Sequence, residues 1–214
     1  MLVYRFLRLI LPVILRIFYR EVSVHGRRNL ISKGPLLVVA NHPNTLLDPI
    51  IVATVLKQRA GFIAKGTFFN NKIVGAILRF FQVIPVYRKI DDGKNPTDAD
   101  NQLSFQKSYE FLAKGGTIIL FPEGTRTPVG SHKPYRKGGA RLAGLTQATV
   151  LPVAHNAGHF WPRNSFLKYP GLITVSIGPA IPSHGKSGDQ LHTEVESWIE
   201  GEMRRIDPES YKAN

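Results

Sequence analysis

Short apolar runs alternate with segments of helical periodicity along most of the chain. The clearest runs are Leu36 to Ala40 and Thr117 to Phe121, which are typical of buried strands. Strands that alternate with helices predict an α/β fold, with a mixed, largely parallel sheet flanked by helices. The other predicted strands are 21–26, 61–64, 83–87, 150–154 and 172–177, and the predicted helices are 46–57, 71–81, 99–114, 138–147 and 191–206.

The charge of the chain narrows the classes of partner. There are 28 basic and 15 acidic residues among 214, a formal net charge of +13. A field of this sign attracts polyanions, which leaves nucleic acid, an anionic membrane or a phosphorylated substrate. The chain has no cysteine, which excludes disulfides, Cys-ligated zinc and thiol catalysis. The absence of P-loop and G-x-S-x-G motifs argues against nucleotide-triphosphate hydrolysis and the usual serine hydrolases.

A histidine and an aspartate follow the strand predicted at Leu36 to Ala40. His42 lies just after the strand, and Asp48 lies in or before the first turn of the next helix. A neutral imidazole can take a proton from a hydroxyl near pH 7, and a carboxylate can fix its tautomer. The pattern therefore predicts His42 and Asp48 as a catalytic pair. Alternatively, Asp48 caps the helix ahead of Pro49, or Thr45 caps it with Asp48 at the third position.

Three basic residues, Lys65, Arg88 and Arg126, each follow a predicted strand. If those strands are parallel, the three cations and the histidine meet at one edge of the sheet, where ligands of α/β proteins bind. Arg126 is the strongest candidate, because its guanidinium matches a phosphate and the preceding residues offer a hydroxyl and a flexible backbone. Otherwise each cation is a solvated residue at a strand end. The candidate phosphate-binding residues are Lys65, Arg88, Glu123, Gly124, Thr125 and Arg126.

Residues 1–20 are predicted to form an amphipathic helix with a broad apolar face. Its cationic stripe falls within an arc of about 120° at helical spacing and consists of Arg5, Arg8, Arg16 and Arg20. These arginines argue against a membrane-spanning helix, and Pro12 predicts a kink or break. We expect residues 1–20 to lie in a membrane interface and residues 21–214 to form one domain. The alternative is a helix that simply packs on that domain.

His155 and His159 are four residues apart, a spacing that suits two zinc ligands on a helix. The strand predicted ahead of them and the glycine at 158 argue against a helix, so no metal site is expected. A nucleic-acid binder would account for the charge but not for the placement of His42 and Arg126.

Together these motifs resemble the PlsC-type lysophospholipid and glycerolipid acyltransferase family over residues 36–180. Asn41 to Asp48 resembles the motif that carries the catalytic histidine and aspartate, and 82–88 resembles the acceptor-binding motif. Residues 121–126 resemble the acceptor phosphate site, and 150–154 resemble a motif near the acyl-donor site. Most members have four residues between His and Asp, whereas this chain has five, as in some glycerol-phosphate acyltransferase-like members. The region from Lys114 onward is more similar to bacterial 1-acylglycerol-3-phosphate acyltransferases.

The resemblance implies an enzyme that moves a fatty acyl group from a thioester to the sn-2 hydroxyl of 1-acylglycerol-3-phosphate, giving phosphatidic acid. His42 would be the general base, and backbone donors around Gly124 would stabilise the oxyanion. The implied partners are lysophosphatidic acid, acyl-CoA or acyl carrier protein, and a phospholipid surface, with no nucleic acid and no cofactor. The implied location is the cytoplasmic face of an inner membrane, as in bacteria. Glycerol 3-phosphate or another lysophospholipid as acceptor, and a non-catalytic lipid-binding module, remain alternatives.

Overall fold

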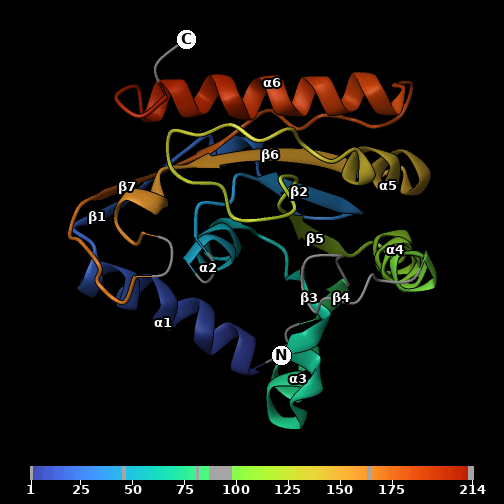
Figure 1. Ribbon diagram of the computed structural model, residues 1–214, viewed down its shortest axis with the longest axis horizontal. Coiled ribbons are helices and arrows are strands. Elements are labelled where there is room, and N and C mark those ends of the chain that lie inside the picture. The colour runs from blue at the N-terminus through green and yellow to red at the C-terminus, as the bar shows by residue number, and fades with distance from the viewer. Residues whose placement is uncertain (1, 45–46, 81, 87–97, 163–164, 212–214) are drawn as a thin grey trace.

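A computed structural model describes residues 2–44, 47–80, 82–86, 98–162 and 165–211 (Figure 1). Its centre is a seven-stranded sheet in the order β1-β7-β6-β2-β5-β3-β4. Neighbouring strands in the sheet are parallel except for the antiparallel pair β6 and β7. The mixed, largely parallel sheet predicted from the sequence is therefore confirmed. The strands are β1 Glu21–His25, β2 Leu36–Ala40, β3 Ala60–Lys65, β4 Val83–Val86, β5 Thr117–Leu120, β6 Thr149–His155 and β7 Leu172–Ile177.

Helices cover both faces of the sheet (Figure 1). Strand β2 is buried along its whole length, and its side chains alternate between the two cores. Leu36 and Val38 pack on the side of α1 (Leu2–Phe18) and α2 (Leu47–Val55). Leu37 and Val39 pack on the side of α4 (Asp98–Ala113), α5 (Gly138–Thr146) and α6 (Gly188–Ile206). Helix α3 (Lys72–Phe80) extends away from the body of the fold.

Helix α1 runs continuously through Pro12, so the break expected there does not occur. The helix is tied to the domain at its carboxyl end, where Leu15 and Tyr19 are buried in the core. The Tyr19 N–H donates to the Leu15 carbonyl at 2.8 Å and closes the last turn. A proline removes one helical donor, and the packing of these two side chains offsets that loss. No helix among the described residues is both long enough and apolar enough to cross a bilayer.

Most predicted boundaries agree with the structure within one or two residues. The main difference is α6, which begins at Gly188 rather than at the predicted residue 191. Ser187 and Gln190 form a capping box, in which each side chain accepts a hydrogen bond from the backbone N–H of the other. Its Ser-x-x-Gln signature is visible in the sequence ahead of the first apolar residue of the helix.

Candidate active site

The topology brings the predicted site segments to one edge of the sheet. Strands β2, β5, β3 and β4 are neighbours in this order and run parallel, so their carboxyl ends lie together. Asn41 and His42 follow β2, the segment 121–126 follows β5, and Lys65 ends β3. Arg88 lies outside the described residues. We call Asn41 to Asp48 the histidine motif and residues 121–126 the arginine motif. The fold therefore places these two motifs side by side, although they are far apart in the sequence.

His42 and Asp48 are in direct contact despite the five intervening residues. The distance from His42 Nδ1 to Asp48 Oδ2 is 2.8 Å, and the Asn44 N–H donates to the same oxygen at 2.7 Å. The Asn44 side chain also accepts a hydrogen bond from the Leu47 N–H, at 3.1 Å, at the first residue of α2. The capping expected of Thr45 or Asp48 is thus supplied by Asn44, while Thr45 lies outside the described residues. This arrangement leaves the Asp48 carboxylate directed at the imidazole.

The imidazole of His42 is held in one orientation. Its ring stacks on Phe121, with 4.2 Å between ring centroids and 14° between ring planes. Because Nδ1 faces a carboxylate oxygen, the neutral ring carries its proton on Nδ1, and Nε2 keeps the lone pair that can accept a proton. The side chain is 17% exposed and Asp48 is 0% exposed. A partly accessible base on a buried carboxylate is the arrangement that general-base catalysis requires.

Two hydrogen bonds join the backbone of His42 to the segment after β5. The His42 N–H donates to Glu123 Oε1 at 2.9 Å, and the Thr127 N–H donates to the His42 carbonyl at 2.9 Å. Thr125 and Arg126, both half-buried, lie in the chain between these two attachment points. One side-chain and one main-chain hydrogen bond therefore hold the segment of the candidate phosphate-binding residues beside the candidate base.

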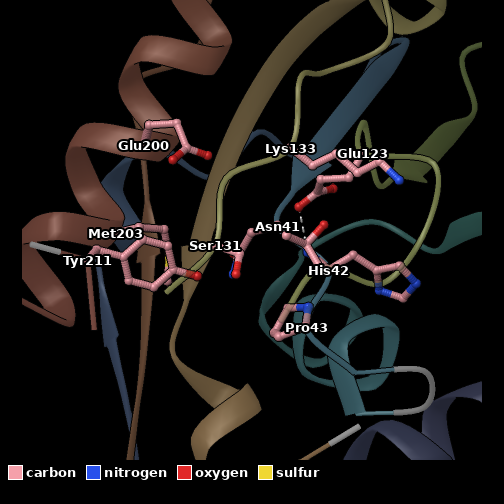
Figure 2. A pocket seen from close by; sticks show the side chains of 10 residues that line it. Asn41, His42, Pro43, Glu123, Ser131, Lys133, Glu200, Met203 and Tyr211 are labelled. Atoms are coloured by element: carbon pink, nitrogen blue, oxygen red, sulfur yellow. Dashed lines mark hydrogen bonds between the residues drawn. The ribbon is translucent and has the colours of Figure 1, made fainter. Parts of the chain in front are cut away.

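A small pocket lies behind the His42 backbone, and Figure 2 shows its lining residues. The imidazole points away from this pocket, whereas Glu123 lies over the His42 backbone. The pocket has a volume of about 10 Å³, comparable to one water molecule. It is therefore a polar gap beside the His42 backbone that is too small to hold a lipid.

Burial shifts the ionisation of two carboxyl groups near His42. Burial raises the pKa of Asp48 to about 7, although the nearby His155 and the Asn44 N–H lower it. Burial raises the pKa of Glu123 to about 8. Hydrogen bonds from the backbone lower this pKa, and the negative charge of Asp48 raises it further. Strongly shifted pKa values of this kind cluster at functional sites.

Comparison with known proteins agrees with this geometry. A family model described as acyltransferase matches residues 21–156. The chain belongs to the acyltransferase family. A 1-acyl-sn-glycerol-3-phosphate acyltransferase of Pseudomonas aeruginosa is 34% identical over 197 residues, covering 87% of this chain and 70% of the relative. The chloroplastic enzyme LPAT1 of Arabidopsis thaliana is 30% identical over 190 residues, covering 87% of this chain but 50% of the relative. The chain thus spans about half the length of the plant enzyme.

A solved structure supports the same assignment. The crystal structure of the 1-acyl-sn-glycerophosphate acyltransferase PlsC from Thermotoga maritima matches with a TM-score of 0.73 at 26% identity. The match covers 87% of this chain and 72% of that chain. This acyltransferase therefore shares the fold of PlsC over most of its length.

Two residues of the arginine motif make hydrogen bonds within the protein. Glu123 is 4% exposed and accepts a hydrogen bond from the His42 N–H, so it supports the segment after β2 rather than a phosphate. The Gly124 N–H donates to the Phe121 carbonyl at 3.1 Å and closes the turn after β5, while an oxyanion site at backbone donors around Gly124 stays a prediction. Gly124 has a φ of 67°, and a Cβ there would lie 2.5 Å from Arg136 Nε. Glycine is needed at this position for backbone shape and close packing.

Sequence reasoning missed the structural part played by Asn41. Its side chain donates to the His155 carbonyl and accepts from the His155 N–H, both at 2.9 Å. This reciprocal pair joins the carboxyl ends of β2 and β6 and holds the residue just before His42. The two residues are 114 positions apart, so the pattern around either one carries no signal of the contact.

The two histidines considered as a zinc pair face different partners. His155 is fully buried at the end of β6, with Nε2 3.9 Å from Asp48 Oδ1. Burial lowers the pKa of His155, so it is neutral behind the Asp48 carboxylate. His159 lies in a 3₁₀ helix (Ala157–His159), with Nε2 2.5 Å from Asp207 Oδ2. His155 therefore faces Asp48, and His159 holds the end of α6.

Glu123→Gln should flatten the pH dependence of stability in this acyltransferase. The folded-state pKa is raised to about 8 from an ordinary value of 4.5, so the folded protein binds the extra proton. The free energy of unfolding should then fall as the pH rises between these values, by up to about 1.4 kcal/mol per pH unit. Glutamine keeps the acceptor for the His42 N–H but cannot ionise.

Urea unfolding at pH 5 and pH 8 measures this effect. The parent should lose more stability than Glu123→Gln between the two pH values. Glu209→Gln, which changes an exposed carboxylate, should behave as the parent. An equal loss in the parent and Glu123→Gln would show that Glu123 does not titrate in this range.

Proposed function

We propose that this acyltransferase moves a fatty acyl group from a thioester to the sn-2 hydroxyl of 1-acylglycerol-3-phosphate, forming phosphatidic acid. The proposal is carried by the His42–Asp48 contact of 2.8 Å, at the same sheet edge as the arginine motif. A base beside a phosphate-binding segment fits a substrate that has both a phosphate and a free hydroxyl. The names of the Pseudomonas and Thermotoga relatives support lysophosphatidate as that substrate.

In the proposed mechanism, His42 Nε2 takes the proton from the acceptor hydroxyl as its oxygen attacks the thioester carbonyl. A C–O bond forms, and the resulting tetrahedral intermediate collapses with cleavage of the C–S bond. The departing thiolate takes the proton back from the imidazolium, so the base is regenerated. The Asp48 carboxylate stabilises the imidazolium between these steps. Because the chain has no cysteine, the acyl group has no thiol of the enzyme to occupy.

Acyl-CoA or acyl carrier protein is the proposed thioester donor, and no further cofactor takes part. Arg126 and Thr125 bind the acceptor phosphate in this proposal, because the hydrogen bonds that join the Glu123 side chain and the Thr127 N–H to the His42 backbone hold their segment beside His42. A guanidinium presents two parallel donors to phosphate oxygens, and a threonine hydroxyl adds a third. Lys65 and Arg88 are proposed as additional cations at the same edge.

The enzyme is further proposed to work at a phospholipid surface, on the cytoplasmic face of an inner membrane, with residues 1–20 as the interfacial segment. Support comes from α1, where Leu15 is buried while Ile17 and Phe18 are 74% and 47% exposed. Arg16 and Arg20 are exposed near these apolar side chains, and Arg5 and Arg8 lie on the same helix. Arginines beside apolar side chains suit a helix that lies among lipid headgroups.

A thiol-release assay tests the reaction. Lysophosphatidate and glycerol 3-phosphate are compared as acceptors, each with acyl-CoA and with acyl carrier protein thioesters. Thiol release that depends on lysophosphatidate, with phosphatidic acid as the lipid product, is the expected result. Release that depends on glycerol 3-phosphate would move the enzyme to the other acceptor. A folded protein that binds vesicles and releases no thiol would instead be a lipid-binding module.

Arg126→Ala should chiefly raise the KM for lysophosphatidate. Loss of charge-assisted hydrogen bonds costs about 1.5–3 kcal/mol, which corresponds to roughly 10- to 150-fold in affinity. Arg126→Lys should fall between the parent and the alanine variant, because an ammonium keeps the charge but not the two parallel donors. Arg204→Ala, an exposed arginine on α6, serves as the control. An unchanged KM in folded Arg126→Ala would contradict phosphate binding by Arg126.

A further inference from the structure

The segment that leads into β7 exposes a group of large apolar side chains. Phe166 is 97% exposed, Leu167 is 66% exposed and Tyr169 is 49% exposed. We call residues 165–172 the apolar loop. Large apolar side chains that project together into water are unfavourable and usually mark a contact surface.

The apolar loop has a defined internal structure. The Trp161 indole N–H donates to the Ser165 carbonyl at 2.7 Å, and the Leu167 N–H donates to the Ser165 hydroxyl at 3.0 Å. The Tyr169 N–H donates to the Phe160 carbonyl at 2.8 Å. Gly171 completes this packing, because a Cβ there would lie 2.0 Å from the Phe160 ring. These contacts hold the backbone so that Phe166 and Leu167 point outward.

The apolar loop lies beside the carboxyl end of α1. Lys168 Nζ is 5.3 Å from the centroid of the Phe18 ring and 4.2 Å from that of Trp161. The Glu21 N–H donates to the Gly171 carbonyl at 3.4 Å, where β1 and β7 begin their parallel pairing. Figure 1 shows the segment before β7 and α1 on the same side of the molecule, opposite α6. The exposed apolar side chains of the loop therefore continue the exposed apolar surface of α1.

Most of the charges around this surface are positive, and the exposed carboxylate of Glu21 lies at its edge. Residues 1–20 and 160–172 contain no aspartate or glutamate, whereas Arg16, Arg20 and Lys168 lie among their apolar side chains. Exposed aromatic rings next to cations suit the boundary between lipid headgroups and acyl chains. An anionic bilayer matches both the apolar and the basic character of the surface.

We propose that the apolar loop is a second membrane-contact element, which inserts Phe166 and Leu167 into an anionic phospholipid surface beside α1. Two separated contacts fix the orientation of the domain on the membrane, which a single helix does not. The inference extends the proposed function, because it supplies a reason for the active site to face the lipid that carries the acceptor.

The chain just ahead of the apolar loop contacts the segment between His42 and Asp48. The Asn44 side chain donates to the Trp161 carbonyl at 2.6 Å. A Cβ on Gly158 would lie 2.5 Å from the Pro43 Cβ, so the chain ahead of the loop packs closely on the residue after His42. The loop thus connects the proposed membrane surface to the segment between His42 and Asp48, and its insertion holds that segment at the bilayer.

Because the natural chain has no cysteine, single labels can be introduced at chosen sites. Phe166→Cys and Ile17→Cys, each carrying an environment-sensitive fluorophore, report on the loop and on α1. Leu145→Cys is the control, since Leu145 is 55% exposed on α5, which covers the other face of the sheet. When vesicles of phosphatidylcholine and phosphatidylglycerol are added, the fluorescence emission of the labels at 166 and 17 should shift to shorter wavelengths and become less sensitive to quenching by iodide. A label at 166 that stays as quenchable as the one at 145 would overturn the proposal.

A charged double variant tests the consequence for activity. Phe166→Asp with Leu167→Asp should weaken vesicle affinity at least about tenfold, because two apolar side chains no longer enter the lipid. Activity on lysophosphatidate in vesicles should fall with it, while activity on a monomeric short-chain lysophosphatidate should not. Leu145→Asp is the matched control. Parent-like vesicle affinity in the double variant would contradict the inference, whereas a parent inactive on both acceptors would contradict the proposed function alone.

Discussion

His42→Ala should reduce turnover by about 10³-fold, within the range of roughly 10²–10⁴ that a general base contributes. The variant removes the lone pair that takes the proton from the acceptor hydroxyl, while the segment keeps its backbone bonds to Glu123 and Thr127. The KM for lysophosphatidate should change little, since Arg126 and Thr125 remain. The thiol-release assay at saturating donor and acceptor measures the difference.

Controls separate this loss of chemistry from a loss of folding. His184→Ala removes an exposed histidine and should keep parent activity. The urea midpoint of His42→Ala should stay near that of the parent, because the backbone hydrogen bonds to Glu123 and Thr127 remain and only the ring contact with Phe121 and the bond to Asp48 are lost. Near-normal turnover in a folded His42→Ala protein would remove His42 from the proposed role and would require another base.

Asp48→Asn should lower turnover by up to about 10⁴-fold, the loss that follows when the carboxylate of a catalytic triad is replaced by its amide. Asparagine is nearly the same size, and its oxygen can still accept from His42 Nδ1 and the Asn44 N–H. What it lacks is the negative charge that stabilises the imidazolium. The effect should appear in kcat, because the charge matters only once His42 has taken the proton.

The same variant should not be less stable than the parent at pH 8. Asp48 is 0% exposed, and its desolvation raises the pKa of the carboxyl to about 7, so an ionised carboxylate there is costly in the folded state. The neutral amide removes that cost. Urea midpoints at pH 8 should therefore be equal or higher for Asp48→Asn. A clear drop in stability would show that Asp48 is mainly a structural cap.

The pH profile provides a further test of Asp48. Because the carboxylate must be ionised to stabilise the imidazolium, kcat/KM of the parent should fall as the pH drops through about 7. Glu123 also titrates near this group, from the segment after β5, and the neutral His155 faces it from β6. The part of this fall in kcat/KM at low pH that is due to Asp48 should be absent in Asp48→Asn and present in Glu123→Gln. An identical fall in all three proteins would assign it to another group.

The strands, the helices and the proximity of neighbouring residues could be predicted from the sequence. The β-branched and aliphatic residues of Leu36–Ala40 predict a strand buried on both faces, which the structure confirms. Periodicity also predicted the positions of the helices within a few residues, because each turn depends mainly on neighbours along the chain. The proximity of His42 and Asp48 was predictable for the same reason, since a short turn and the start of a helix keep them together.

The contacts around the candidate base depended on the order of strands in the sheet. Asn41 pairs with His155, and the His42 backbone pairs with Glu123, only because β6 and β5 flank β2. Strand order and the antiparallel β6–β7 pair have no local signature. Glu123 was therefore predicted at the phosphate, whereas the structure shows its carboxylate accepting a hydrogen bond from the His42 N–H. Local patterns along the chain indicate which segments form strands and helices and which residues carry reactive groups. Which of those groups meet depends on how the sheet is assembled, because the hydrogen bonds around His42 join segments that are distant in the sequence.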